Sequence, residues 1–393
     1  MYITQAFNVL HDWWRYLFGT LIAIIGVFIF SMPHGFAILA KRMNAEVDMS
    51  RFDDVNYLMS LFEPNLNLVF MLLPFAGGLL FLIIAVKLLH KQSFTQLTTV
   101  RSKIDWKRFW FAFILWGVAS SGLIFLDYSM DPESYQWNFN MQPFLILCVL
   151  AIILVPLQTS FEEYLFRGYL MQGIGVSTTN NRFPFAFLYI LASIVLYVVL
   201  ERYAVLGYWT NMLLIFGLTV LLVVLLSTTM LDKIYESELN QKLMKVLRRN
   251  VTPLIITSAA FGLLHIANPE IDQLGHILLV YYIGTGLFLG IMTLMDDGLE
   301  LALGFHAANN LFTALLVTAD WTAFQTHSIY KDISQPEAAG FIDVFMPVLV
   351  IFPLVLLIFS KKYKWSNWND KLFGSIKTPP KEDYQIIGET IDD

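Results

Sequence analysis

Residues 143–170, PFLILCVLAIILVPLQTSFEEYLFRGYL, decide how this chain folds. From Pro143 to Leu157 the segment is uncharged and almost entirely apolar, which predicts a membrane-spanning helix. The ionisable residues Glu162, Glu163 and Arg167 then follow in the same segment. Charged side chains at membrane depth are costly, and they usually face a bundle interior or a water-filled cavity and serve function. The segment therefore predicts a transmembrane bundle with a polar site inside it.

The spacing of these charged residues separates two carboxylates. On a helix, Glu163 and Arg167 are four residues apart and lie on one face, so they can form an ion pair. Glu162 lies about 100° round the helix from Glu163 and has no local ion-pair partner. A free carboxylate beside a neutralised one suits a general base. The alternative is a structural ion pair with a second acid near the membrane interface, and the spacing leaves both open.

The composition places the whole chain among helical membrane proteins. Of its 393 residues, 57% are hydrophobic and 14% are charged. Ten apolar stretches are long enough, or nearly so, to cross about 30 Å of hydrocarbon. The expected fold class is therefore all-α, a polytopic transmembrane bundle of about ten spans. The ten stretches are Trp14–Met32, Leu66–Leu89, Phe109–Leu126, Pro143–Leu170, Pro184–Leu200, Asn211–Met230, Thr252–Ile266, Gly275–Met295, Leu299–Ala319 and Phe341–Phe359.

Loop charges predict the orientation of the bundle. The connections after the second, sixth and tenth stretches are rich in Lys and Arg, whereas alternate connections carry Asp and Glu. Basic loops stay in the cytoplasm, so both termini are expected there.

The net charge of −6 gives no indication of a nucleic-acid partner. The single cysteine, Cys148, excludes an internal disulfide and a cysteine-based zinc site.

Two further apolar stretches carry polar side chains. Phe261 and His265 share a helical face in the seventh stretch, as do His306 and Asn310 in the ninth. A single histidine in a membrane helix is often a packing residue, but these groups on three helices indicate one site. Glu162 can polarise a water, with His265 sharing the proton. His306 and Asn310 can then stabilise the oxyanion of a scissile carbonyl.

The same residues also allow a metal centre. Glu162, His265 and His306 are a workable Zn²⁺ ligand set, with water in the fourth position. The sequence lacks the His-Glu-x-x-His pattern of common helical zinc proteases. Two hypotheses therefore stand, catalysis that requires no cofactor and catalysis by Zn²⁺. In both, the reaction is hydrolysis of a peptide bond by water inside a membrane cavity.

The ordered motifs Glu-Glu-x-x-x-Arg, Phe-x-x-x-His and His-x-x-x-Asn, on separate helices, resemble those of the CPBP family. This family includes type II CAAX prenyl endopeptidases and bacterial Abi and bacteriocin-processing relatives. The resemblance implies a helical-bundle intramembrane endopeptidase, in a bacterial plasma membrane, that acts on a membrane-associated protein or peptide. The family has been interpreted both as metalloproteases and as glutamate-dependent proteases, so it does not decide the cofactor. The implied catalytic residues are Glu162, His265, His306 and Asn310, and the supporting residues are Glu163, Arg167 and Phe261.

One feature departs from the family pattern and shapes the expected organisation. The interval from Arg167 to His265 is much longer than in the family. Its excess corresponds to a helical hairpin inserted at about residues 184–230, which leaves the orientation of later spans unchanged. The expected parts are three N-terminal spans (1–140), the catalytic core with its hairpin (141–320), a last span (321–360) and a loose cytoplasmic tail (361–393).

Helix lengths leave the level of the site open. Counted from Pro143, Glu162 lies about 28 Å along its helix, near the cytoplasmic boundary. Counted from Pro253, His265 lies about 18 Å from that boundary, so the two residues do not lie level. Tilt, a kink at Pro156 or a longer helix would bring them together.

Two other function classes remain open. A transporter or proton-coupled carrier would also place Glu and His side chains at depth. The sequence does not have the pair of Gly- or Pro-broken spans in equivalent halves that inverted repeats produce. A non-catalytic membrane scaffold would keep the polar cluster only for folding. The sequence determines neither the substrate, including whether it is prenylated, nor the oligomeric state.

Overall fold

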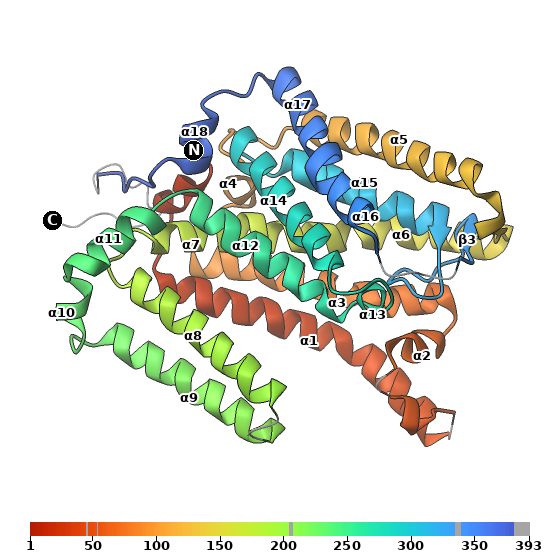
Figure 1. The fold of residues 1–393 in the computed structure, drawn as a ribbon, viewed down its shortest axis with the longest axis horizontal. Helices are drawn as coiled ribbons and strands as arrows, with labels where there is room; N and C mark the ends of the chain where they lie inside the picture. Colours follow the sequence, from red (N-terminus) through yellow and green to blue (C-terminus); the bar gives the residue numbers. More distant parts are fainter. Residues whose placement is uncertain (45, 53, 204–206, 335–338, 381–393) are drawn as a thin grey trace.

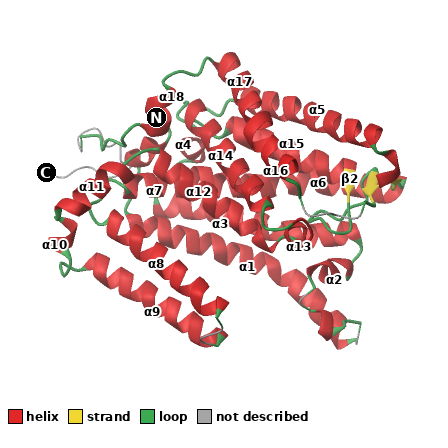
Figure 2. Ribbon diagram, viewed as in Figure 1, coloured by secondary structure: helices red, strands yellow, loops and turns green. Residues whose placement is uncertain are grey.

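The structure is a computed structural model that describes residues 1–44, 46–52, 54–203, 207–334 and 339–380. Helices make up most of the described chain and pack lengthwise into one bundle, which confirms the predicted all-α class (Figures 1 and 2). The longer α-helices are α1 (Trp13–Met43), α3 (Pro64–Leu89), α5 (Trp106–Met130), α6 (Met141–Glu163), α8 (Phe183–Arg202), α9 (Tyr208–Ser227), α12 (Val251–Leu263), α14 (Leu278–Asp296), α15 (Glu300–Leu316) and α17 (Phe352–Tyr363). The shorter ones are α2 (Val55–Ser60), α4 (Phe94–Thr98), α7 (Met171–Ser177), α10 (Asp232–Tyr235), α11 (Glu238–Leu247), α13 (Pro269–Leu274), α16 (Phe341–Met346) and α18 (Trp368–Phe373).

Eight helices of the described chain are long and apolar enough to cross a membrane. They correspond to eight of the ten predicted stretches. Their outward faces carry many exposed large apolar side chains, as expected for surfaces in contact with lipid. The eight are Trp13–Met43, Pro64–Leu89, Trp106–Met130, Met141–Ser177, Phe183–Arg202, Trp209–Ser227, Leu278–Asp296 and Phe341–Tyr363.

The two remaining stretches are shorter helices that carry parts of the predicted site. The seventh is the apolar helix Val251–Ala267, and the ninth is α15, which has 17 residues. Residues 300–308 of α15 are all buried, because α5, α6 and α14 pack around it. The helices that position polar residues are thus surrounded by the longer ones.

The helix that bears the two glutamates is longer than predicted. Instead of ending at Leu170, it runs without a break from Met141 to Ser177. The 3.6-residue turns of α6 give way to a π-helical segment, η4 (Tyr164–Leu170), directly after Glu163. Glu162 therefore lies well inside the helix and not near its end, where the sequence placed it. Wider π turns within α-helices are frequent at functional sites.

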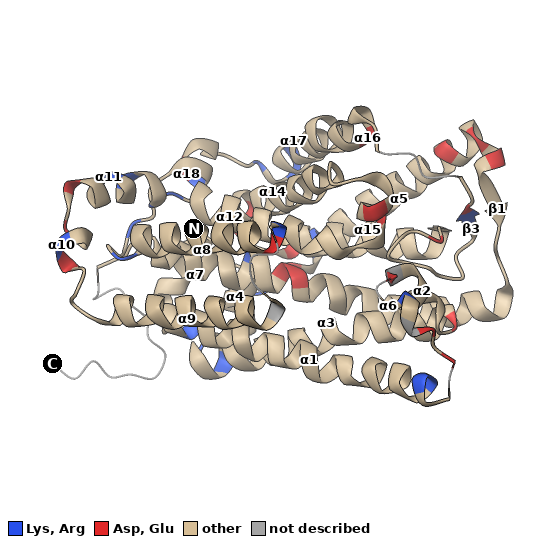
Figure 3. Ribbon diagram, turned by 60° about the horizontal axis from the view of Figure 1, so that its bottom comes forward, with Lys and Arg blue, Asp and Glu red and all other residues tan. Residues whose placement is uncertain are grey.

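A basic connection fastens one end of the bundle. Arg101 donates to Asp296 at 3.1 Å and to Glu300 at 3.2 Å, and Arg108 also pairs with Asp296. The Asp296 and Glu300 side chains are almost fully buried. The α14–α15 turn, which leads into the site helix, is therefore held by charges from the connection between α3 and α5. The long helices α1 and α8 carry their charged residues near their ends, and α9 contains none (Figure 3).

A small sheet closes the opposite end of the bundle. Its strands are β1 (Tyr135–Trp137), β2 (Val317–Thr318) and β3 (Tyr330–Asp332), in the order β1-β3-β2. β1 pairs antiparallel with β3, with Gln136 opposite Lys331, and β2 runs parallel to β3. The sheet ties the α5–α6 connection to the segment that follows α15. Nothing in the sequence pattern predicted these strands, which have two or three residues each.

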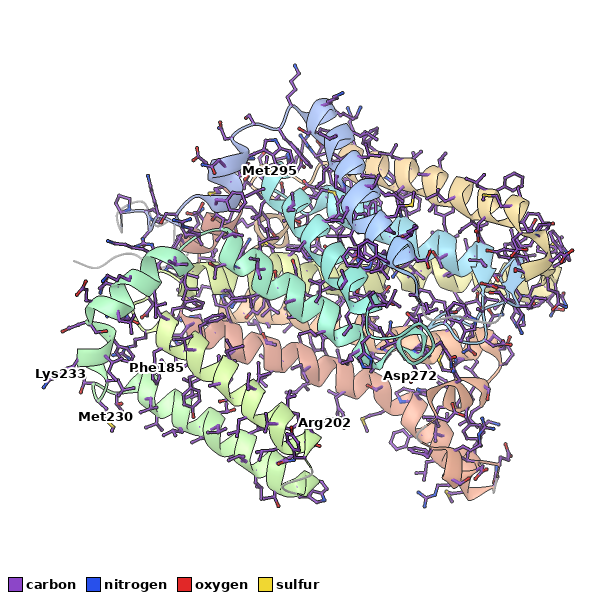
Figure 4. All side chains as sticks on the ribbon, in the orientation of Figure 1. Phe185, Arg202, Met230, Lys233, Asp272 and Met295 are labelled. Atoms are coloured by element: carbon purple, nitrogen blue, oxygen red, sulfur yellow. The ribbon has the colours of Figure 1, made fainter. Side chains whose placement is uncertain are left out.

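The inserted hairpin predicted at 184–230 is present as α8 and α9. The two helices pack against each other, and α11 packs against α8. In Figure 1 the pair stands at the side of the bundle, beyond α1. Figure 4 labels Arg202 at one end of this hairpin and Lys233 at the other.

The prediction of a loose tail is wrong for its first part. Residues 368–373 form α18, and Leu372 and Ile376 are buried in a cluster with Ile3 and Phe7 of the N-terminal segment. An isolated bridge joins Arg249 to Ser375. The apolar residues are few but adjacent, so they suffice to dock the segment. The predicted tail beyond residue 380 lies outside the described residues.

The contact between α5 and α15 provides a test of this packing. A Cβ added at Gly304 would overlap the carbonyl oxygen of Phe109, whereas one added at Gly122 of α5 would meet nothing. We expect Gly304→Ala to lower the free energy of unfolding by about 1–3 kcal/mol, because the two backbones must separate. Gly122→Ala should be neutral or stabilising by up to about 1 kcal/mol. Thermal unfolding in detergent micelles measures both, and equal stability of the two variants would contradict the close approach.

Candidate active site

A cavity of about 910 Å³ opens between α3, α5, α6, α12, α14 and α15. It brings together residues that lie far apart in the sequence. Polar groups gather on the walls formed by α6 and α15, while α3 contributes the apolar side chains of Met71, Leu72 and Phe75. The predicted site residues that line it are Glu162, Phe261, His265, His306 and Asn310.

Behind the cavity wall, Glu163 holds two side chains at once. Its Oε1 accepts a hydrogen bond from Arg167 Nη1 at 3.0 Å and one from His306 Nδ1 at 2.8 Å. Glu163 and Arg167 are fully buried. The predicted ion pair is therefore present. Its additional contact with His306 was not predicted, because it depends on how α15 packs against α6.

Arg167 completes this buried group from the far side. Its guanidinium lies over the Phe261 ring at 4.1 Å from the ring centroid, a cation–π arrangement. Its Nη2 also donates to the Gly286 carbonyl at 3.5 Å. Phe261, in turn, packs edge-on against His306, with ring centroids 6.1 Å apart. These contacts explain why arginine and phenylalanine accompany the polar residues.

One carboxylate oxygen of Glu162 is free, and the other accepts a hydrogen bond that the sequence did not predict. Gln158, one turn earlier on the same helix, donates to Glu162 Oε1 at 2.7 Å. The other oxygen, Oε2, is buried and has no hydrogen-bond partner among the described residues. It lies 3.5 Å from His306 Nε2. Glu162 thus has no ion-pair partner on its own helix, and its free oxygen faces the imidazole of α15.

The contact with Glu163 determines which ring nitrogen of His306 carries a hydrogen. Glu163 as a carboxylate can only accept, and it already binds Arg167, so Nδ1 of His306 must carry a hydrogen. A neutral His306 then presents an unprotonated Nε2 to Glu162, and only a protonated ring has a hydrogen there as well. His306 can therefore donate into the cavity only in its doubly protonated form.

His265 lies in the cavity wall but apart from this group. It belongs to a 3₁₀ segment, η5 (Leu264–Ala267), and its Nδ1 donates to the Phe261 carbonyl at 2.8 Å. The ring stacks on Tyr282 at 4.2 Å and contacts Phe261 at 4.8 Å. Nε2 is thereby left as an acceptor. The structure brings His265 to the cavity of Glu162, and Phe261 bridges it to His306.

Three residues of the site were missed by the sequence reasoning. Gln158 accepts from Asn310 Nδ2 at 3.0 Å, Asn309 donates to Asn310 at 3.1 Å, and Trp116 donates to Asn309 at 3.0 Å. Gln158 is an amide inside an apolar run, one helical turn before Glu162, and this spacing was a usable signal. Trp116 gave no signal, because its contact with Asn309 depends on the packing of α5 against α15.

The arrangement does not fit a three-ligand zinc site. Within the described ranges, no three His, Cys, Asp or Glu side chains are grouped closely enough to hold a metal ion. The Nδ1 atoms of His306 and His265 are bonded to Glu163 and to a backbone carbonyl, which leaves Nε2 of each ring as the nitrogen that a metal ion would bind. The candidate ligands Glu162, His265 and His306 line one cavity without converging on one point.

One relative matches nearly the whole chain. Over 362 residues the chain is 25% identical to the uncharacterized protein YyaK of Bacillus subtilis (strain 168), covering 89% of this chain and 93% of that protein. No solved structure matches this chain.

A family model matches the part of the chain that follows the hairpin. The matched residues, 234–312, contain Phe261, His265, His306 and Asn310, that is, the second and third motifs. Glu162 and its neighbours lie before the hairpin and outside the match. Residues 234–312 are thus similar to the type II CAAX prenyl endopeptidase Rce1-like family.

Proposed function

We propose that this protein is an intramembrane endopeptidase in which Glu162 activates a water molecule against a peptide bond of a membrane-associated protein or peptide. The observation that carries the proposal is the free Oε2 of Glu162, buried in a cavity of about 910 Å³ and opposite His306. A scaffold would need only the ion pair of Glu163 with Arg167. The family match over residues 234–312 supports proteolysis over transport.

Attack by water is the first step. A water held between Glu162 and the scissile carbonyl loses a proton to Oε2 while its oxygen bonds to the carbonyl carbon. The carbonyl oxygen becomes an oxyanion, and Asn310 and a doubly protonated His306 donate to it. One N–H of Asn310 is engaged by Gln158, and the second is available for the oxyanion.

Collapse of the tetrahedral intermediate completes the reaction. Glu162 returns the proton to the leaving nitrogen, the carbon–nitrogen bond breaks, and the new acid and amine separate. Glu163 keeps His306 in register throughout and balances its charge. His265 and Tyr282 form the adjoining wall, where they help to orient the substrate or the attacking water.

We propose that the reaction requires no zinc. Support comes from the placement of the candidate ligands, because Glu162, His265 and His306 line one cavity but do not form a group that could hold a metal ion. The apolar wall supplied by α3 suits a substrate that reaches the site from the membrane. Prenylation of that substrate is not assumed.

The bundle is proposed to lie in a bacterial plasma membrane with both termini in the cytoplasm. In Figure 1 the N-terminus, α4, α11 and α18 lie toward the same end of the bundle. The connections at this end include the basic segments between α3 and α5 and around α11. Basic connections remain on the cytoplasmic side during insertion.

Replacement of each glutamate by glutamine, one at a time, tests the function directly. Glu162→Gln should lower hydrolysis by about 10²–10⁴-fold while the melting temperature stays near the native value, because a general base is lost. Membrane peptides from cells with native protein and from cells with Glu162→Gln are compared by mass spectrometry. Peptide termini that appear only in cells with native protein identify the substrate. Identical peptide sets from the two kinds of cells would contradict the proposal.

Glu163→Gln is the matched control. It leaves Arg167 buried without its carboxylate, which is expected to lower the free energy of unfolding by about 3–5 kcal/mol. Equal loss of folded protein in both variants would show that the two glutamates do not divide the roles as proposed.

Removal of one oxyanion donor and removal of metal give a second test. Asn310→Ala should slow cleavage by about 10²–10³-fold, since one such donor contributes about 2.7–4 kcal/mol to the barrier. Metal content should be unchanged, as measured by elemental analysis of purified protein.

Treatment of the native protein with a chelator should leave its cleavage rate unchanged. Stoichiometric zinc, whose removal and return switch cleavage off and on, would overturn the metal-free mechanism.

Cysteine labelling tests the orientation. In a Cys148→Ser background, Gln241→Cys on α11 and Glu133→Cys near β1 both present exposed positions. An impermeant maleimide added to intact cells should label position 133 and spare position 241. Labelling of position 241 in intact cells would reverse the orientation.

A further inference from the structure

Beyond the motif residues, a chain of side-chain amides runs from α5 to Glu162. We propose that Trp116, Asn309 and Gln158 are positioning residues, which fix the orientation of the Glu162 carboxylate and the Asn310 amide. This inference rests on the proposed function, because it assigns the chain a role in catalysis by Glu162. None of the three residues belongs to the motifs that marked the site.

Four consecutive hydrogen bonds build the chain. Trp116 Nε1 donates to Asn309 Oδ1 at 3.0 Å, and Asn309 Nδ2 donates to Asn310 Oδ1 at 3.1 Å. Asn310 Nδ2 donates to Gln158 Oε1 at 3.0 Å, and Gln158 Nε2 donates to Glu162 Oε1 at 2.7 Å. Each amide therefore accepts from the residue before it and donates to the residue after it.

The two ends of the chain set its direction. The indole N–H of Trp116 can only donate, and an ionised Glu162 can only accept. If any one of the three amides turned over, two donors would meet at one side and two acceptors at the other. Each such mismatch leaves buried polar groups unpaired, which costs about 1–3 kcal/mol per group. The amide orientations therefore follow from the chemistry of the terminal groups.

This direction has a consequence for the reaction. Because Gln158 occupies Oε1 of Glu162, the free oxygen is Oε2, the one that lies 3.5 Å from His306 Nε2. Asn310 gives one N–H to Gln158 and keeps the other. The base and the oxyanion donor are thus aligned by one network. Hydrogen bonds in such a chain polarise one another, so a break at one end is expected to act at the other.

The chain also joins the catalytic groups to helix packing. It passes from α5 to α15 and then to α6, and Trp116 is largely buried, with its ring against Phe305 at 4.4 Å between centroids. The other ionisable groups near Glu162 are Glu163 and Arg167 on its own helix, His306 on α15, and His265 across the cavity. Among them, His306 faces Oε2 and also binds Glu163, as does Arg167, whereas the amide chain holds Oε1.

Infrared spectroscopy of the purified full-length protein tests the chain without relying on cleavage. The carboxylate band of Glu162 is the difference between the native spectrum and that of Glu162→Gln. Gln158→Leu should shift this band, and Trp116→Phe should shift it less, because three residues of the chain lie between the indole N–H and Glu162. Trp116→Phe added to Gln158→Leu should produce no further shift, since the chain is already cut.

Trp110→Phe is the matched control for loss of an indole. Trp110 lies on the same helix, is 52% exposed and packs against Phe109 and Phe113. Its replacement should leave the band unchanged. The melting temperature of each variant shows whether it is folded, and Trp116→Phe keeps an aromatic ring against Phe305.

Kinetics on the peptide identified through Glu162 give the second readout. Gln158→Leu should lower kcat roughly 10- to 100-fold, the effect of one hydrogen bond to a charged group, with KM little changed. Trp116→Phe should lower kcat by less, and Trp110→Phe should not lower it.

The two readouts separate the inference from the proposed function. A Glu162 band that does not respond to Gln158→Leu, or that shifts equally with Trp116→Phe and Trp110→Phe, would overturn the chain even if the native protein cleaves its substrate. Band shifts as expected, together with no cleavage by native protein, would support the chain and overturn the proteolytic function.

Discussion

The buried carboxylate of Glu163 is the constraint on which the rest of the site depends. It has no exposed surface and accepts from both Arg167 and His306 through one oxygen. A charge in that setting persists only if partners of opposite charge or hydrogen-bond donors are built around it. The need to satisfy it brings α15 against α6 at one particular register and sets which nitrogen of His306 faces the cavity.

Two polar layers result, one on each side of the cavity wall. Glu163, Arg167 and His306 form the inner layer, with Phe261 covering the guanidinium. The outer layer consists of Glu162 with the amides that lead to it. Both glutamates have one oxygen without a hydrogen-bond partner among the described residues, but only Glu162 lines the cavity, whereas Glu163 is fully buried behind its wall. This difference is the physical basis for assigning base chemistry to one glutamate and support to its neighbour.

The α8–α9 hairpin lies between the first motif and the part of the chain that the family model matches. The family match begins at residue 234, after α8 and α9, although the first motif lies before them. Because a hairpin returns the chain to the same end of the bundle, α12 and α15 can still approach α6. The site is therefore assembled across an interruption that separates its motifs in sequence but not in space.

The sequence by itself determined the helical class, eight of the spans, the hairpin and the residues of the three motifs. These follow from apolar runs of membrane length and from helical spacing, which are local properties. The spacing of Glu163 and Arg167 sufficed to predict their ion pair, since both lie on one helix. The sequence did not reveal the short strands, the docked α18 or the continuation of the glutamate helix to Ser177.

Only the tertiary structure decided which partners meet across helices. The contact of His306 with Glu163, the separation of His265 from both glutamates, and the link from Trp116 to Asn309 depend on the packing of α5, α12 and α15 around α6. No sequence period encodes the rotation of one helix against another. That rotation is fixed by side-chain packing and by the hydrogen bonds that buried polar groups form across helices, which involve the whole bundle.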